Sequence, residues 1–280
     1  MLLVTGATGT IGAEVARGLA SLGAVRILAR RPEAVTADGP HVEIVEGDYA
    51  DPRALERAFE GVRAAFLVTN RPGEPDDERL IGAARDAGTR HLVKLSAAAV
   101  GDRAADDLIT GWQRGNERLI QAGGPDWTLL RPRSFMSNTL SWVGSVRSEG
   151  VVRALYGTSS NACVDPRDVA EVAVRVMTEP GHAGQTYTLS GPEAISARQQ
   201  TEQLADVLGR ALRFEELTES QVRTHLARRY PPEVADALLA SSRRQLDGAK
   251  TGVSQTVRQL TGRPARTFRA WAADHADAFA

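Results

Sequence analysis

Three glycines, spaced three residues apart, join a short apolar run to an amphipathic segment. The run is Leu2–Thr5, the glycines are Gly6, Gly9 and Gly12, and the amphipathic segment continues to Leu22. In a strand–turn–helix of this kind the first glycine permits the tight turn, the second lets the backbone approach a pyrophosphate and the third lets the helix pack closely. This context predicts a dinucleotide site rather than a glycine-rich turn without a ligand. The residues expected to contact the nucleotide are Gly6, Thr8, Gly9, Thr10, Ile11 and Gly12.

Short apolar runs alternate with amphipathic stretches through the first half of the chain, as in βα units around a parallel sheet. The expected strands are Leu2–Thr5, Val25–Ala29, Val42–Glu46, Ala64–Val68, His91–Leu95 and Trp127–Arg131. The fold class predicted is α/β, a doubly wound parallel-sheet Rossmann fold with a smaller, mainly helical C-terminal lobe. We expect a nucleotide-binding domain over residues 1–150 and a substrate lobe over 151–280, with the helix 166–178 packing back on the first domain.

The residues after the second strand indicate which nucleotide is bound. An NAD enzyme places Asp or Glu there for the ribose hydroxyls. Here Val25–Ala29 is followed by Arg30 and Arg31. A guanidinium matches a 2′-phosphate bidentately, so we predict NADP(H) with Arg30 as the main contact. The alternative is that both arginines are solvated loop residues.

Ligands of open α/β sheets bind at the carboxyl ends of the strands, so the residues following three further strands are expected to line the cofactor. Asp48 suits the adenine amino group, and Val68–Asn70 suit the ribose or nicotinamide side. The full set is Gly47, Asp48, Tyr49, Val68, Thr69, Asn70 and Ser96.

Composition excludes several other classes of protein. Lys and Arg number 34 against 35 Asp and Glu, which argues against a nucleic-acid or membrane-surface partner. The single cysteine, Cys163, forms no internal disulfide and no thiolate cluster, and no His spacing suggests a metal site. No run resembles a signal peptide or a membrane span, so we expect a cytoplasmic monomer or homodimer acting on a small molecule.

Several motifs in order resemble the NmrA-like atypical short-chain dehydrogenase/reductases. They are GATGTIG at Gly6–Gly12, LARRPE at Leu28–Glu33, VEGDYADP at Val45–Pro52, AAFLVT at Ala64–Thr69, WTLLRPRSFMSN at Trp127–Asn138, VDPRDVAEVA at Val164–Ala173 and YTLSGPEAIS at Tyr187–Ser196. The resemblance covers most of the chain. It implies an NADPH-binding Rossmann domain and a small substrate lobe, in a family that holds quinone reductases, natural-product tailoring reductases and proteins that only sense the cofactor.

The chain departs from the wider superfamily at the proton donor. Ordinary members carry Tyr-x-x-x-Lys on the helix after the fifth strand, where the lysine lowers the pKa of the tyrosine. Alignment through Glu117 puts Ile109 in the tyrosine slot, Gln113 in the lysine slot and Ala98 in the serine slot. Gln113 is therefore a candidate for hydrogen bonding the nicotinamide ribose, the alternative being a solvated helix face. For a tailoring reductase that uses an acid of the substrate lobe, the candidate proton donors are Tyr156, Asp165 and Asp168, and the alternative for Asp165 is a helix cap.

Loss of this pair favours some acceptors over others. Reduction of a simple ketone makes an alkoxide nearly as basic as hydroxide, with the pKa of water at about 15.7 as reference. A reduced quinone oxygen resembles a phenolate with a pKa of about 10, and an enone spreads its charge into an enolate. We therefore expect an NADPH-dependent oxidoreductase acting on a quinone, enone or related carbonyl compound. The alternatives are a non-catalytic NADP(H) sensor and a tailoring reductase.

Residues after the sixth strand are expected to meet the substrate. Phe135 is a candidate wall of the ring site, with core packing as its alternative. Asn138 is a polar group that suits a carbonyl oxygen and, with Gln113, is a catalytic candidate. Trp112 and Trp142 either stack on a flat substrate or plug the seam between the lobes.

Overall fold

The structure, a computed structural model, describes residues 1–280 and divides into two compact units. Unit 1 comprises residues 1–100, 112–132 and 166–188, and unit 2 comprises 101–111, 133–165 and 189–280. The two units are therefore interleaved along the chain, unlike the division expected at residue 150. The difference arises because 101–111 and 133–150 have most of their contacts in unit 2, although they lie in the first half of the chain.

Unit 1 is built on a seven-stranded sheet in the order β3-β2-β1-β4-β5-β6-β9. Its strands are β1 Leu2–Thr5, β2 Val25–Ala29, β3 Val42–Glu46, β4 Ala64–Leu67, β5 His91–Leu95, β6 Asp126–Pro132 and β9 Gln185–Leu189. The pairs among β1 to β6 are all parallel. The predicted doubly wound sheet is confirmed, and β9 extends it beyond the six strands expected.

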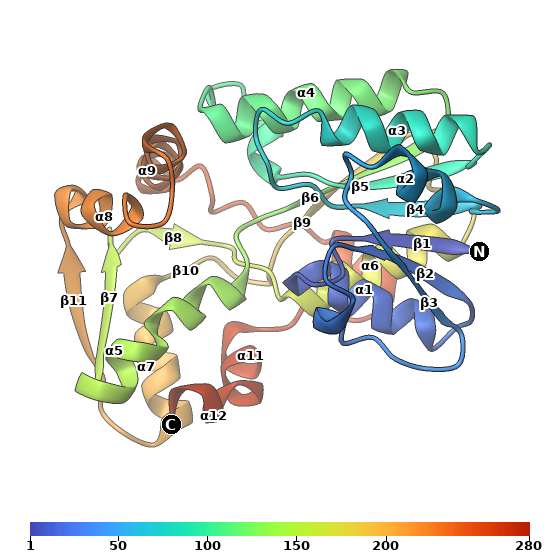
Figure 1. The fold of residues 1–280 in the computed structure, drawn as a ribbon. Coiled ribbons are helices and arrows are strands. Elements are labelled where there is room, and N and C mark those ends of the chain that lie inside the picture. The colour runs from blue at the N-terminus through green and yellow to red at the C-terminus, as the bar shows by residue number, and fades with distance from the viewer. The chain divides into compact units, whose positions relative to one another are not determined.

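Helices cover both faces of this sheet. Figure 1 shows α2, α3 and α4 on one face and α1 and α6 on the other. Their bounds are α1 Thr10–Ala20, α2 Pro52–Phe59, α3 Asp76–Asp86, α4 Leu108–Ala122 and α6 Pro166–Thr178. A Cβ on Gly18 of α1 would lie 2.9 Å from Val174 Cγ2 of α6, so a glycine there permits the close crossing of these two helices.

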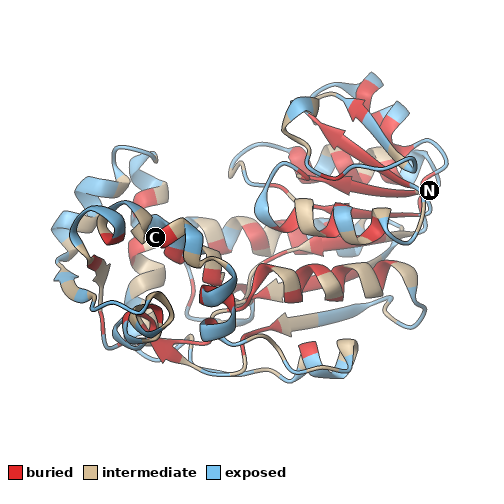
Figure 2. Cartoon of the chain, turned by 90° about the horizontal axis from the view of Figure 1, so that it is seen from below, coloured by how far each residue is buried: buried red, intermediate tan, exposed pale blue.

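The inner strands of the sheet are buried from both sides and are red in Figure 2, whereas the edge strands β3 and β9 are largely exposed or half-buried. All four residues of β1 and all five of β2 are buried. Strands buried on two faces read as continuous apolar runs, which is why the sequence located them within one or two residues.

Unit 2 has no large sheet. Its strands are β7 Val151–Leu155, β8 Ser160–Asn161, β10 Ile195–Ser196 and β11 Arg213–Leu217. Its helices are α5 Val143–Glu149, α7 Ala197–Leu208, α8 Glu219–Leu226, α9 Pro232–Leu246, α10 Thr256–Thr261, α11 Phe268–Asp274 and α12 Ala276–Phe279. A 3₁₀ segment, η3 Met136–Trp142, precedes α5.

A separate apolar core holds unit 2 together. Phe268, Trp271 and Phe279 are buried with Met136 and Val152. Ser196 and Thr218 each begin a helix with a reciprocal capping box, which satisfies two backbone N–H groups at each start. No helix of the chain is long and apolar enough to cross a membrane.

Candidate functional site

The turn between β1 and α1 is shaped by two of its three glycines. Gly6 has a φ of +66°, and a Cβ there would lie 2.8 Å from Val68 Cβ. A Cβ on Gly12 would lie 2.3 Å from the Gly6 carbonyl oxygen, so the helix start also requires glycine. A Cβ on Gly9 would meet that oxygen at 3.4 Å, an ordinary contact. Packing within the fold thus requires glycine at positions 6 and 12 but does not require it at position 9.

The first turn of α1 presents unpaired backbone N–H groups. Gly9 is the N-cap and provides no side-chain cap, while its own N–H donates to the Gly6 carbonyl at 2.9 Å. Thr8, Gly9 and Thr10 are exposed, and the Ile11 side chain is buried, so Ile11 offers only its backbone to a ligand. Free N–H groups at the positive end of a helix dipole form an anion site. This cradle fits a dinucleotide pyrophosphate.

A chain of charges links the ends of β2, β3 and β4. The Arg30 side chain is 63% exposed and its Nε lies 3.7 Å from Asp48 Oδ2. Arg71 Nη2 lies 3.3 Å from Asp48 Oδ1, and the same guanidinium binds Asp76 through two hydrogen bonds of 2.7 and 2.8 Å. The structure therefore brings the predicted Arg30 and Asp48 together and adds Arg71. The residues predicted after β4 are Val68, Thr69 and Asn70, and Arg71 follows them directly.

Asp48 is ionised in this arrangement. The Ala50 backbone N–H, and then the charge of Arg71, hold the pKa of this carboxyl below its usual range. Asp48 thus joins two cations as an acceptor-only group. Its carboxylate suits the adenine amino group or positions Arg30.

Two other predicted residues, Gly47 and Tyr49, have roles in the fold as well. A Cβ on Gly47 would lie 2.2 Å from Ala54 Cβ, so glycine is required for α2 to pack here. The Tyr49 hydroxyl donates to the Val68 carbonyl at 3.1 Å, and burial raises the pKa of this phenol. Asn70 is exposed.

Below the end of β4 lies a buried ion pair. Lys94 Nζ of β5 is 3.0 Å from Asp77 Oδ1, and both side chains are at most 3% exposed. Thr69 Oγ1 accepts from Lys94 at 2.7 Å and donates to Asp77 Oδ2 at 2.6 Å. The hydroxyl of Thr69, predicted to face the cofactor, is thus committed to this network. Burial lowers the pKa of Lys94, and Asp77 opposes that shift.

The predicted Ser96 lies in a second buried network. Its hydroxyl donates to Glu117 Oε1 at 2.5 Å, and Arg131 binds both carboxylate oxygens of Glu117 at 2.8 and 2.5 Å. Ser96 Oγ is therefore occupied within the chain. The sequence pattern did not reveal Glu117 or Arg131 as its partners because they come from α4 and β6.

On α4 the predicted residues face different surroundings. The Trp112 ring centroid is 6.0 Å from Lys94 Nζ, and its indole lines a cavity of about 230 Å³ with Pro75, Asp77 and Asn116. The indole Nε1 and Gln113 Oε1 are buried without partners within the chain. Trp112 thus packs toward the start of α3, and Gln113 keeps an unused acceptor.

The residues predicted after the sixth strand, and Tyr156, belong to unit 2. Phe135 pairs with Val164 in an isolated bridge, and Trp142 packs against the apolar core of unit 2. Asn138 is exposed on η3. Tyr156, at a φ of +52°, donates its hydroxyl to Glu219, which raises the pKa of the phenol.

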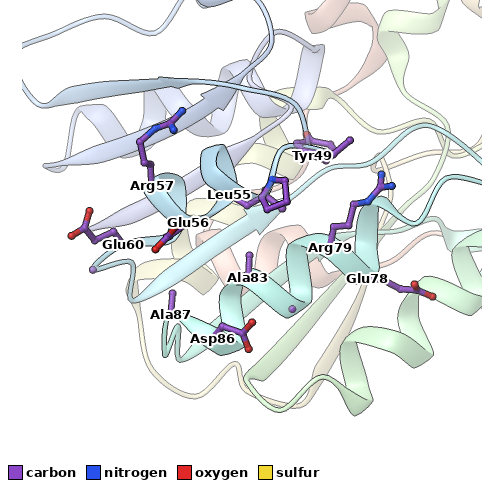
Figure 3. Close-up of a pocket in the computed structure, with 14 residues that line it drawn as sticks. Tyr49, Leu55, Glu56, Arg57, Glu60, Glu78, Arg79, Ala83, Asp86 and Ala87 are labelled. Carbon is purple, nitrogen blue, oxygen red and sulfur yellow. The ribbon is translucent and has the colours of Figure 1, made fainter.

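A groove of about 880 Å³ lies between α2 and α3 (Figure 3). Leu55 of α2 and Ala83 of α3 lie on facing sides, with charged residues such as Arg57 and Glu78 along the rim. Tyr49 is the one predicted site residue in its lining. The groove therefore belongs to the outer face of unit 1 and not to the glycine-rich turn.

Comparison with known proteins agrees with this geometry. A family model described as NAD(P)H-binding matches residues 6–180. A (4-alkanoyl-5-oxo-2,5-dihydrofuran-3-yl)methyl phosphate reductase of Streptomyces griseus is 61% identical over 280 residues, covering 100% of this chain and 99% of the relative.

Two more distant relatives are also reductases. An NAD(P)H azoreductase of Xenophilus azovorans is 36% identical, covering 100% of this chain and 99% of the relative. The crystal structure of an NADPH-dependent quinone oxidoreductase from Escherichia coli, complexed with NADPH, superposes with a TM-score of 0.85 at 25% identity, covering 98% of this chain and 99% of that chain.

Proposed function

This chain belongs to the NAD(P)H-binding family as an NmrA-like oxidoreductase, and on that premise we propose that it uses NADPH to reduce a carbon–carbon double bond conjugated to carbonyl groups. The acceptor we propose is a (4-alkanoyl-5-oxo-2,5-dihydrofuran-3-yl)methyl phosphate. The observation that carries this choice is the 61% identity, over the whole chain, to a reductase named for that compound. The sequence alone predicts a quinone, enone or related carbonyl compound as the acceptor, and this identity narrows the proposed class of acceptor to an unsaturated lactone.

The chemistry of this acceptor suits a site without Tyr-x-x-x-Lys. The ring double bond is conjugated both to the lactone carbonyl and to the alkanoyl carbonyl. A hydride adds at the ring carbon that carries the phosphorylated methyl group, and the electron pair left on the neighbouring carbon is shared by two carbonyl oxygens. Such an anion is far less basic than the alkoxide of a simple ketone, so water suffices as the proton source. The reaction can therefore proceed with Ile109 in the tyrosine slot and Gln113 in the lysine slot.

Several residues support NADPH as the cofactor. The unpaired N–H groups at Thr10 and Ile11 suit the pyrophosphate. The side chain of Arg30 is largely exposed beside Asp48 and is available to a 2′-phosphate. When bound, NADPH supplies the hydride. Gln113 Oε1, which has no partner in the chain, supports the predicted hydrogen bond from a ribose hydroxyl.

Substrate positioning is assigned to residues after β6. We propose that Phe135 forms a wall of the ring site and that the Asn138 amide donates to one of the carbonyl oxygens. Correct placement of donor and acceptor then supplies most of the rate enhancement, because no strong acid takes part.

The test is a comparison of acceptors. Purified protein and NADPH are followed at the NADPH absorbance band with the unsaturated lactone phosphate, a naphthoquinone and a saturated aliphatic ketone. We expect the lactone phosphate to be reduced with the highest kcat/KM and the ketone not at all. With NADPH deuterated at the transferred position, the label should appear at the ring carbon bearing the phosphorylated methyl group. Faster turnover of the quinone or ketone than of the lactone would contradict the proposal.

A further inference from the structure

Two cations of unit 2 have no carboxylate within ion-pair distance. Arg133 Nη1 donates to the Ala249 carbonyl at 2.8 Å, but its Nε is buried without a partner. A Cβ on Gly252 would lie 3.1 Å from Arg133 Nη2, so this guanidinium lies directly against the chain at 249–252. Lys250 belongs to the same short segment after α9.

The backbone around Lys250 is held from both sides. Its carbonyl accepts from the Ala162 N–H at 3.0 Å, and the preceding carbonyl accepts from Arg133. The Ala249 N–H in turn donates to the Arg244 carbonyl at 3.0 Å. Lys250 is thus fixed in place, half-buried, without an acid to bind its ammonium group.

Three cations in this region, Arg133, Lys250 and Arg244, face two carboxylates, Asp102 and Asp107, which leaves one positive charge in excess. Arg244 is the third cation nearby, and it is neutralised by Asp107 at 2.7 Å, with Asp102 at 4.0 Å. Burial lowers the pKa of Lys250 to about 8, and the cations Arg244 and Arg133 act in the same direction. Withdrawing cations from water without a counterion costs free energy, which an incoming anion would recover.

A phosphate monoester matches this pair in charge and in hydrogen bonding. It carries nearly two negative charges at pH 7 and three acceptor oxygens. Arginine offers a planar fork of donors and lysine a compact ammonium, the two side chains most used for phosphate. Arg133 also follows Pro132, the last residue of β6, and ligands of such sheets bind where the strands end.

Resting on the proposed function, we infer that Arg133 and Lys250 bind the phosphate group of the substrate and select phosphorylated over unphosphorylated acceptors. The phosphates of the cofactor belong instead to the α1 start and Arg30. The inferred site therefore affects recognition of the acceptor and leaves cofactor affinity unchanged.

The first test compares the lactone phosphate with its matched alcohol, which has the same ring and alkanoyl chain but a free hydroxymethyl group. In Lys250→Met we expect KM for the phosphate to rise about 10- to 100-fold, as for loss of a charge-assisted contact, with little change in kcat. The values for the alcohol and the Kd of NADPH should stay unchanged. Arg133→Lys, which keeps the charge but removes the fork, should give a smaller loss of the same kind. Arg228→Met, which removes one exposed cation of the same unit, is the control.

A second measurement separates this site from the proposed reaction. Methyl phosphate should raise the Tm of the wild-type protein and of Arg228→Met but not that of Lys250→Met. If the lactone phosphate is not reduced while methyl phosphate still acts through Lys250, the proposed function fails and the anion site stands. The inference is overturned if Lys250→Met keeps the wild-type preference for the phosphate over the alcohol. It is also overturned if methyl phosphate leaves the wild-type Tm unchanged.

Discussion

Lys94 and Lys250, the two lysines of this chain, are both withdrawn from water, yet only Lys94 has a carboxylate within ion-pair distance. In unit 1 the cations near the strand ends are matched with acids: Lys94 with Asp77, Arg71 with Asp76, and Arg131 with Glu117. In unit 2 Arg133 and Lys250 lie together without such partners. A cation that forms an ion pair within the chain stabilises the fold. A half-buried cation without such a carboxylate can instead bind an anionic ligand, which is the role we propose for Lys250.

Replacing Lys94 should give the largest effect. Lys94→Met leaves Asp77 buried without its counterion, so we expect the free energy of unfolding to fall by about 3–5 kcal/mol. Urea denaturation followed by circular dichroism measures this change. The double variant Lys94→Met with Asp77→Leu should recover most of the loss. A loss below about 1 kcal/mol in the single variant would show that the pair is not structural and would break the contrast between the two lysines.

Arg30 is a cation of unit 1 that remains available to an anionic ligand, because its side chain is largely exposed and its nearest acid is 3.7 Å away. It therefore tests whether availability, and not the unit, separates the two kinds of cation. Arg30→Ala should raise the Kd of NADPH about 10- to 100-fold, the range for a hydrogen-bonded charge, and leave stability unchanged. NADH, which lacks the 2′-phosphate, should bind the variant as it binds the wild type. Fluorescence titration gives both constants, and an equal loss for the two nucleotides would contradict a contact with the 2′-phosphate.

The pH dependence of substrate recognition tests the unpaired state of Lys250. With its pKa at about 8, the ammonium is present below that pH and is lost as the pH rises through it. KM for the phosphate acceptor should therefore increase about tenfold between pH 7 and pH 9.

The other groups facing Lys250 do not titrate in this range. Burial raises the pKa of the Cys163 thiol to about 11. Burial also acts to raise the pKa of Asp107, but hydrogen bonds from Thr110 and Arg244 outweigh it and hold that pKa below its usual value. Arginine side chains remain protonated throughout this range. The matched alcohol, and Lys250→Met with either acceptor, should give a flat KM, and a parallel rise for the alcohol would assign the titration to another step.

The smallest expected effect is that of replacing Lys250 on the free energy of unfolding. Because folding lowers the pKa of Lys250 from an unfolded value of about 10.4, the buried charge opposes folding at neutral pH. Lys250→Met should leave the free energy of unfolding unchanged or raise it by about 1 kcal/mol. The wild-type protein should gain stability between pH 8 and pH 10, and the variant should lack that gain. Thermal unfolding across this range measures both, and a loss above 2 kcal/mol at pH 7 would reveal a structural partner.

Most of the fold was predictable because its signals are local. The buried strands of unit 1 are continuous apolar runs, and the turn at Gly6–Gly12 reveals its conformation in seven residues. The interleaving of the two units was not predictable, because no local signal shows that 101–111 have most of their contacts in unit 2. The 3₁₀ form of Met136–Trp142 was likewise hidden, since its apolar spacing also fits an α-helix.

The site was predictable where backbone geometry decides it and not where distant side chains meet. Arg30 and Asp48 follow from their places at strand ends. Thr69 and Ser96 were expected to face the cofactor, but their hydroxyls are engaged by Asp77 and Glu117 from other elements. Arg133 and Lys250 are far apart in the sequence, and only the folded chain brings Arg133 against the Ala249 carbonyl, next to Lys250.

The interleaving of the two units has a consequence for how this chain can change during evolution. The chain passes from one unit to the other after residues 100, 111, 132, 165 and 188. A single recombination breakpoint between residues 111 and 165 would therefore divide both units and bring together halves selected in different genetic backgrounds. New acceptor preferences among such reductases are expected to arise by point substitutions and loop changes rather than by exchange of whole gene segments.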